Sequence, residues 1–312
     1  MSHSLDDTLV LHRNETTRAS FSQAPTTPLQ IDIHLVDPTR ALSALDKSSF
    51  LQVFSCIQRL AHRLKDDLGV HRFGLISEGR SRLSLIPMHG IEQGSAWKPI
   101  LAPDSVFYGE TFPGYVGSRN GKKMSDDELD RVRDALRAVS GLRPQDIDTS
   151  LIGAHDRQNL FARLIVEDIP CWKYHDTPDH VAFLTPFPNT TGYSCVIPKR
   201  HYPSDILAMP EQPYRALVAA GWDVAQQMKR AFHVDHVGFI MEGYEINHAH
   251  FKLVPIFERE DATAQGSPPG EAWSERYEGY LTSQRGKQLR EGEELERLRQ
   301  LASSLRKKLA HV

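Results

Sequence analysis

The sequence predicts an α+β fold in which two tandem antiparallel sheets are each packed against helices. Short runs of β-branched and aromatic residues, separated by Pro, Asn, Thr and Gly, are typical of antiparallel strands. Amphipathic helical stretches lie between these runs, and the same order of elements occurs twice in 312 residues. Strands and helices that alternate in this way predict an antiparallel sheet with helices against it.

The duplication is visible as pairs of matching segments. GYVGSRNGK at 114–122 returns as GYLTSQRGK at 279–287, which is an offset of 165 residues. VHRFGLISEG at 70–79 matches VDHVGFIMEG at 234–243 at an offset of 164, and the Thr-Thr pair at 26–27 matches that at 190–191 at the same offset. Segments that repeat at nearly one spacing indicate a tandem duplication, with copies at 1–150 and 151–312.

The elements of the second copy can be assigned in order. We expect strands at 161–166, 181–184 and 193–197, and then a helix whose apolar residues recur every three or four positions between 217 and 231. Strands at 237–241 and 248–254 follow, and leucines at 295, 298, 301, 305 and 309 predict a C-terminal amphipathic helix. The first copy mirrors this order, with its middle helix at 50–68 and a charged helical run at 126–142.

Composition excludes several classes of protein. The chain has 37 Lys+Arg against 40 Asp+Glu, so no basic field favours binding of long nucleic acid. It has no run of about 18 apolar residues and no basic leader followed by an apolar stretch, so we expect a cytoplasmic protein that does not span a membrane. The 3 cysteines predict neither a disulfide framework nor structural zinc.

Residues that could carry chemistry are concentrated in the second copy. His248, His250 and Lys252 alternate with apolar residues, so on a strand these three side chains would share one face. Two imidazoles and an ammonium in a row suit an anion, because an imidazole can attack phosphorus and an ammonium can neutralise phosphate oxygens. The first copy is four residues shorter here, and we place the gap at 247–250; its segment 80–84 contains no histidine.

The second copy resembles the histidine triad (HIT) family, whose signature is His-φ-His-φ-His-φ-φ with φ apolar. The segment FLTPFPNTTGYSCVIPKRH at 183–201 looks like the central hairpin of that family, and the resemblance covers about 161–258. It implies a fold in which the two copies form an intrachain pseudo-dimer, similar in layout to galactose-1-phosphate uridylyltransferases. It also implies an enzyme that attacks the α-phosphate of a nucleoside phosphate, acting as a nucleotide hydrolase or nucleotidyltransferase.

The resemblance assigns roles to residues. His250 would be the nucleophile and His248 would orient it, while Lys252 replaces the third histidine of the signature and keeps a hydrogen-bond donor. The acidic residue that usually follows the FL pair is replaced by Thr185. Further catalytic-site candidates, which would bind the substrate, are Asn247, Lys199, His201, Asn189 and Lys287. The partner implied is a nucleotide or nucleotide conjugate, with no metal and no cofactor.

Several alternatives stay open at this point. The chain could be a transferase of the dinucleoside-polyphosphate phosphorylase kind, or a nucleotide-binding pseudoenzyme in which Lys252 has ended turnover. The GYxxSxxGK segments could form a phosphate-facing turn with Lys122 or Lys287, or they could be structural because the copy without histidines retains them. An intrachain pseudo-dimer leaves the oligomeric state open.

Overall fold

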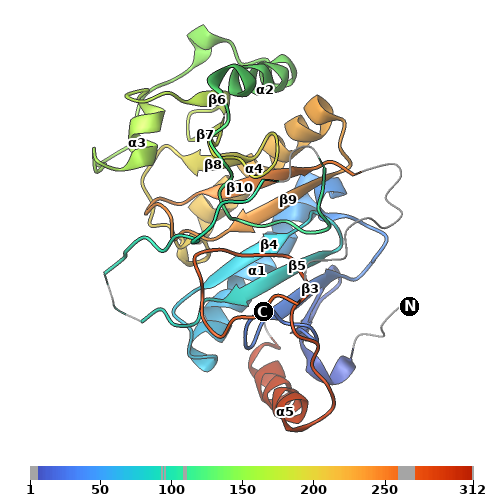
Figure 1. Ribbon diagram of the computed structural model, residues 1–312. Coiled ribbons are helices and arrows are strands. Elements are labelled where there is room, and N and C mark those ends of the chain that lie inside the picture. The colour runs from blue at the N-terminus through green and yellow to red at the C-terminus, as the bar shows by residue number, and fades with distance from the viewer. Residues whose placement is uncertain (1–5, 93, 95, 108–110, 259–270, 311–312) are drawn as a thin grey trace.

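The protein is built on one continuous antiparallel sheet of ten strands (Figure 1). The computed structural model describes residues 6–92, 94, 96–107, 111–258 and 271–310. From one edge to the other, the strands are β1 (Val10–Arg13), β2 (Thr17–Phe21), β3 (Ile31–Leu35), β5 (Arg82–Pro87), β4 (Phe73–Ser77), β9 (His236–Met241), β10 (Phe251–Ile256), β8 (Ser194–Pro198), β7 (His180–Leu184) and β6 (Trp172–Asp176).

The sheet has an approximate two-fold axis between β4 and β9. Five strands of one half on one side of this axis correspond in order to five strands of the other half, and the two central strands pair with Ile76 opposite Ile240. Gly79, with a φ of 72°, ends β4 where a Cβ atom would lie 2.0 Å from the carbonyl oxygen of Val237. A side chain there would separate the halves. The sheet therefore has the pseudo-dimer arrangement that the repeated segments predict.

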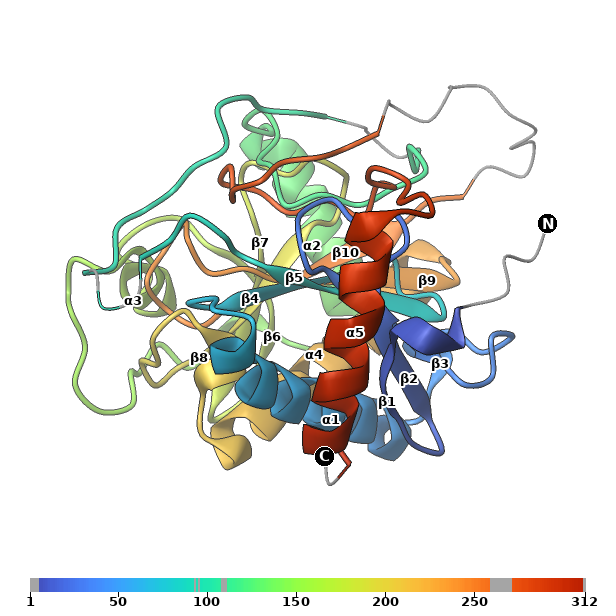
Figure 2. The same ribbon diagram turned by 90° about the horizontal axis from the view of Figure 1, so that it is seen from below.

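Two long helices cover one face of the sheet. These are α1 (Lys47–Asp67) and α4 (Glu211–Phe232), which lie on the same side in Figure 2. The Tyr214 hydroxyl donates to the carbonyl of Phe54 at 2.9 Å, and the Phe54 ring lies 5.8 Å from that of Phe251. Their apolar stripes, with those of the core strands, form the main hydrophobic core.

The helices that follow the GYxxSxxGK segments pack against the opposite half. α2 (Asp126–Ser140) belongs to the first half but lies beside β6, where Arg137 Nε donates to the carbonyl of Lys173 at 2.8 Å. α5 (Glu293–Lys308) belongs to the second half but lies along β1, where Arg306 Nε donates to the carbonyl of Val10 at 2.9 Å. Figure 1 shows these two helices at opposite ends of the molecule. The two tails are therefore exchanged between the halves.

The expected helices at 50–68, 126–142 and 217–231 are present, and so is the C-terminal helix. The strands expected at 181–184, 193–197 and 237–241 match β7, β8 and β9 within a residue or two. The strand expected at 161–166 is wrong, because this segment forms the helix α3 (Leu160–Ile165). Its first turn is capped by the Asn159 side chain, which accepts hydrogen bonds from the amides of Phe161 and Ala162. Short 3-10 turns occur at Asp7–Leu9, Leu42–Ala44, Pro144–Asp146 and Ile206–Ala208.

The register of the sheet corrects the alignment of the two halves. Lys252 faces Ile240 as Ser84 faces Ile76, so the histidines correspond to Arg82 and Arg80. The residues without a counterpart are therefore 244–247 rather than 247–250. The second half carries an inserted loop directly before its histidines.

No helix in the described ranges has the length and apolar character that a bilayer crossing requires.

Candidate active site

The two histidines and the lysine lie on one side of the sheet, opposite α4. Ala249, Phe251 and Leu253 point into the main core under α4, so the alternating side chains of His248, His250 and Lys252 point the other way. The strand expected at 248–254 begins later, at Phe251, so the histidines precede it. The extended alternation nevertheless continues through them, because both imidazoles contact the ring of Phe161 on that side.

The hydrogen bonding of His250 leaves one ring nitrogen available. Its Nδ1 lies 2.7 Å from the carbonyl oxygen of His248 and must carry the proton, since a carbonyl only accepts. The lone pair is therefore on Nε2. Burial, with only 1% of the residue exposed, and then the charge of Lys252 lower the pKa of His250 to about 4. At neutral pH the imidazole is neutral, and Nε2 has the free lone pair that a nucleophile needs.

His248 is also held neutral. Its Nε2 donates to the carbonyl of Pro198 at 2.9 Å. Burial lowers its pKa to about 3. Its Nδ1 has no hydrogen-bond partner among the described residues, so a buried acceptor is left free. The peptide carbonyl of His248 fixes the tautomer of His250, and its ring fills the space behind.

Lys252 is a buried cation between two carboxylates. Its Nζ donates to Glu242 Oε2 at 3.1 Å and lies 3.5 Å from Glu245 Oε2. Burial lowers the pKa of Lys252, but the Glu242 and Glu245 carboxylates outweigh it and hold that pKa above its usual range. The side chain therefore stays positively charged and does not lose its proton near neutral pH.

The inserted loop at 244–247 provides one of these carboxylates. Burial raises the pKa of Glu245, but Lys252 and a hydrogen bond from Asn120 bring it below the usual value. Asn120 Nδ2 donates to Glu245 Oε1 at 2.7 Å. Since Asn120 belongs to the first half, that half takes part in ordering the loop beside the histidines.

Side chains from the segment before β6 cover the histidines. The ring of Phe161 lies 5.2 Å from that of His250 and 5.7 Å from that of His248. His155 stacks on His248 at 6.4 Å, and His201 meets His248 edge to face at 5.2 Å. These rings pack around the histidines, and 1% of His250 is exposed.

The five substrate-binding candidates differ in where their polar atoms are directed. Lys199 is fully buried and its Nζ pairs with Asp176 at 2.6 Å and Asp148 at 2.9 Å. His201 Nε2 donates to the carbonyl of Asn247 at 3.0 Å, so both residues lie beside His248. The structure brings His201 and Asn247 to the histidines. The amine of Lys199 is instead paired with the two aspartates.

The other two candidates, Asn189 and Lys287, make contacts between an exchanged segment and the half on which it packs. Asn189 Nδ2 donates to the carbonyls of Gly117 and Arg119 at 2.9 and 2.8 Å. Lys287 lies on the first half, where its amide donates to the carbonyl of Pro25 and its Nζ lies 5.6 Å from the ring centre of Trp273. Pro25 connects to β3, four strands from β10, which places it about 20 Å away at the usual strand spacing.

The GYxxSxxGK segments have a structural explanation at each conserved position. The first glycine of each adopts a positive φ, 92° at Gly114 and 87° at Gly279. The second crosses the opposite half so closely that a Cβ atom would lie 1.8 Å from the carbonyl of Pro188 at Gly121, and 1.7 Å from that of Pro25 at Gly286. The amides of both second glycines donate to backbone carbonyls, so they do not face a phosphate.

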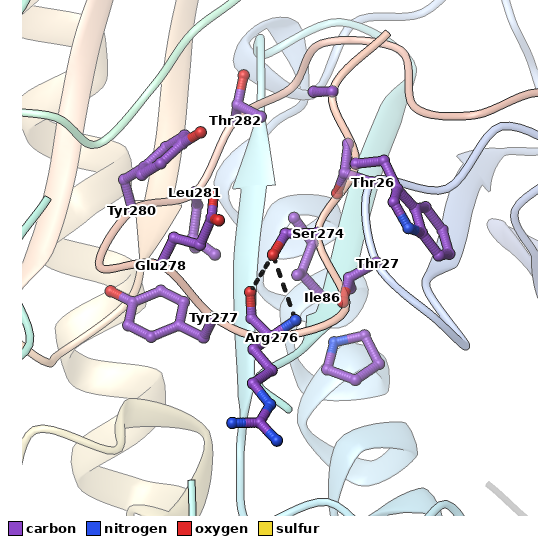
Figure 3. A pocket seen from close by; sticks show the side chains of 13 residues that line it. Thr26, Thr27, Ile86, Ser274, Arg276, Tyr277, Glu278, Tyr280, Leu281 and Thr282 are labelled. Carbon is purple, nitrogen blue, oxygen red and sulfur yellow. Dashed lines mark hydrogen bonds between the residues drawn. The ribbon is translucent and has the colours of Figure 1, made fainter. Parts of the chain in front are cut away.

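A cavity of about 60 Å³ lies in the first half, between the connection from β2 to β3 and the returning segment at 272–282 (Figure 3). Its lining includes Thr26, Thr27 and Ile86. A smaller cavity at 112–117 and 254–256 occupies the corresponding position in the second half. The cavity of Figure 3 is thus a feature of the exchanged segments and is separate from the histidines.

Four residues at the site escaped the sequence reasoning. Glu242 and Glu245 escaped because an acidic residue near a lysine has no spacing signal when a loop intervenes. Phe161 was placed on a strand, and His155 lies in an irregular segment. The repeat nevertheless pointed to Glu242, because it precedes the last glycine of VDHVGFIMEG and Glu78 holds the equivalent position in VHRFGLISEG.

Comparisons with known proteins find relatives of part of this chain. No family model matches the chain. The adenosine 5'-monophosphoramidase hnt1 of Schizosaccharomyces pombe is 33% identical over 92 residues, covering 26% of this chain and 69% of that protein. A HIT-like protein of Saccharolobus solfataricus is 27% identical over 106 residues, covering 32% of this chain and 76% of that protein.

Among solved structures, a HIT-like protein from Bartonella henselae aligns over 50% of this chain and 98% of its own, with 24% identity and a TM-score of 0.30. The first relative is sufficiently similar over most of its length to assign the family. The chain belongs to the histidine triad family.

Proposed function

We propose that this protein transfers a nucleoside monophosphate from a nucleotide conjugate through a covalent intermediate on His250. Nε2 of His250 attacks the α-phosphorus, the bond from phosphorus to the leaving group breaks, and water or another acceptor then releases the nucleotide. The supporting relative is named an adenosine 5'-monophosphoramidase. We propose the same class of substrate for this chain.

The observation that carries the proposal is the hydrogen bond from His250 Nδ1 to the carbonyl of His248. At 2.7 Å it fixes the tautomer that leaves Nε2 unprotonated, and the pKa of about 4 keeps the ring neutral at physiological pH. A nucleophilic imidazole needs both conditions; burial alone keeps the ring neutral, and the hydrogen bond to the carbonyl selects the tautomer.

Lys252 supplies charge in this proposal. Its ammonium is permanent, so it stabilises negative charge on the phosphoryl oxygens, and it does not give its proton to a leaving group. His248 and Asn247 support the nucleophile and the loop before it. His201, whose ring meets that of His248, is the remaining candidate for contact with substrate.

The same property of Lys252 favours a second candidate reaction. A leaving group that departs as an anion, such as a phosphate, needs no proton and is stabilised by a fixed ammonium. This favours nucleoside diphosphate conjugates as donors and inorganic phosphate as an acceptor, which is the phosphorylase type of transfer.

Trapping the intermediate tests the proposal. The full chain is incubated with adenosine 5'-phosphoramidate and with α-³²P-labelled ATP, quenched in alkali, and mapped for labelled peptide. We expect label on His250 and none in His250→Ala, and a loss of at least 10³-fold in turnover for that variant. Discharge by water identifies a hydrolase, and discharge accelerated by phosphate identifies the phosphorylase type.

The pseudoenzyme alternative predicts a different result. If nucleotide binds saturably but neither conjugate labels the protein nor turns over, the chain binds nucleotides without chemistry and the proposal is wrong. His248→Gln serves as a control for the site, because it removes an imidazole while the backbone carbonyl that holds His250 remains.

We also propose that the two halves, 1–150 and 151–312, descend from one HIT-like unit, with the histidine motif retained only in the second. Supporting this are the matched segments and the mirrored strand order. Arg80 and Arg82 occupy the histidine positions in the first half, which therefore cannot form the same intermediate.

A further inference from the structure

One buried hydrogen-bond network joins the GYxxSxxGK segment of the first half to Lys252. Ser118 Oγ donates to Glu242 Oε1 at 2.8 Å, and the other oxygen of that carboxylate accepts from Lys252 at 3.1 Å. Ser118 is the serine of the GYxxSxxGK motif. The cation beside His250 is therefore connected to the half without histidines through the Glu242 carboxylate, in addition to the contact of Glu245 with Asn120.

A second hydroxyl completes the network. The Tyr277 hydroxyl donates to Glu242 Oε1 at 2.7 Å. Glu242 and Lys252 are only 5% and 4% exposed, so water does not replace a lost partner at low cost. With both hydroxyls in place, the carboxylate accepts hydrogen bonds from three side chains, which hold it beside the lysine.

The first half contains a similar hydrogen bond, but its carboxylate, Glu78, lies 3.8 Å from Arg80 Nε and has no buried lysine beside it. Ser283 Oγ donates to Glu78 Oε1 at 2.7 Å, which mirrors the bond from Ser118 to Glu242. The position of Lys252 is there occupied by Ser84, and that of Tyr277 by Phe112. A structural contact that both halves share has, in the second half only, a lysine and an additional hydroxyl.

The hydroxyls of Ser118 and Ser283 also accept equivalent hydrogen bonds from backbone amides. Ser118 Oγ accepts from the amide of Leu281 at 2.8 Å, and Ser283 Oγ accepts from the amide of Val116 at 2.9 Å. Removing either hydroxyl therefore breaks one bond to a backbone amide and one to a carboxylate. Ser283→Ala thus controls for the loss of these bonds at a carboxylate that is more exposed and that pairs with Arg80 in place of Lys252.

We propose that Ser118 and Tyr277 are positioning residues of the histidine site, which hold the Glu242 carboxylate so that the Lys252 ammonium stays fixed beside His250. The first half, which has no histidines, thereby completes the site of the second. This inference rests on the proposed function only for the role of Lys252 in catalysis. The network itself exists whether or not the protein turns over substrate.

The kinetic test compares Ser118→Ala, Tyr277→Phe and Ser283→Ala in the full chain. Loss of either hydroxyl removes one of the hydrogen bonds that hold the Glu242 carboxylate, so Lys252 is no longer fixed in place. We expect Ser118→Ala and Tyr277→Phe to lower kcat with adenosine 5'-phosphoramidate by about tenfold or more, with little change in KM. Ser283→Ala should keep the wild-type kcat and KM.

Thermal unfolding separates this effect from simple damage to the fold. Ser118→Ala and Ser283→Ala should both lower Tm, because each breaks a bond to a backbone amide and one to a carboxylate. If the two serine variants also share one kcat and one KM, Ser118 has only a structural role and the inference is overturned.

A measurement without substrate keeps the inference testable if the proposed function fails. Proteins labelled with ¹⁵N-lysine report the Nζ resonance of Lys252, which Lys252→Arg assigns. We expect Ser118→Ala and Tyr277→Phe to move this resonance and to lower the pH at which it titrates, and Ser283→Ala to leave it in place. An unchanged resonance in all three variants would refute the positioning role independently of any turnover.

Discussion

At the scale of single residues, burial controls the chemistry of the two histidines. Burial is the main cause of both lowered pKa values, and at His250 the nearby Glu245 carboxylate offsets only part of it. The same burial that makes His250 a neutral nucleophile makes it expensive to protonate in the folded protein. The neutral state of His250 and the stability of the folded protein therefore depend on pH together.

This coupling predicts a pH dependence of stability. His248 and His250 have folded pKa values of about 3 and about 4, against 6.5 when unperturbed. As the pH falls below 6.5, the unfolded chain binds protons that the folded chain does not, so stability present above that pH is lost on acidification down to about pH 4. Each histidine contributes at most about 1.4 kcal/mol per pH unit in this window.

Urea unfolding between pH 7 and pH 4 measures the slope. His248→Gln with His250→Gln should flatten it by up to about 2.8 kcal/mol per pH unit. His62→Gln, which changes an exposed histidine of α1, should leave the slope close to that of the wild type. A double variant with the slope of the wild type would mean that the two imidazoles titrate alike in the folded and unfolded protein.

The sequence predicted which residues alternate but not what their polar atoms contact. Alternation is local, so His248, His250 and Lys252 could be placed on one face from their spacing alone. Lys199 pairs with Asp148, which is 51 positions away, and Asn189 binds Gly117, which is 72 positions away. Such contacts depend on the exchanged tails, which no local pattern encodes.

At the scale of elements, α3 packs against the two histidines. It is a six-residue helix whose Phe161 ring contacts both imidazoles, while its first turn depends on one capping side chain. A run such as Leu-Phe-Ala-Arg-Leu-Ile also fits a strand, because a short apolar segment carries no clear period. Only the capping residue, Asn159, distinguishes the two, and this explains the wrong prediction.

We expect Phe161→Ala to expose His250. Diethyl pyrocarbonate reacts with accessible neutral imidazoles, and peptide mass spectrometry locates the product. The matched control is Phe183→Ala, since Phe183 is equally buried and its ring lies 5.7 Å from that of Phe161. Both variants should lose about 3–5 kcal/mol of stability, but only Phe161→Ala should accelerate modification of His250. Equal rates in the two variants would show that access is controlled elsewhere.

At the scale of the whole molecule, the repeated segments predicted the pseudo-dimer correctly, because a fixed offset constrains both halves at once. The exchange of tails was not predictable in this way. A repeat shows that α2 and α5 are equivalent, but each could pack on its own half or on the other, and the same apolar stripe serves both arrangements. The structure resolves this through contacts such as that of Ser140 Oγ with the carbonyl of Tyr174 at 2.6 Å.

The exchange predicts that neither half is stable alone. Separated at residue 150, the first half would expose the edge of β4 and leave α2 without a sheet, and the second would expose β9 and leave α5 without one. Coexpressed, fragments 1–150 and 151–312 should associate one to one, which size-exclusion chromatography with light scattering measures, and should label on His250. Shortening the second fragment to 151–290 removes α5 and should reduce hydrogen-exchange protection at β1, which belongs to the first half. A fragment 151–312 that is folded and monomeric by itself would show that the halves are independent and that their exchanged tails contribute little.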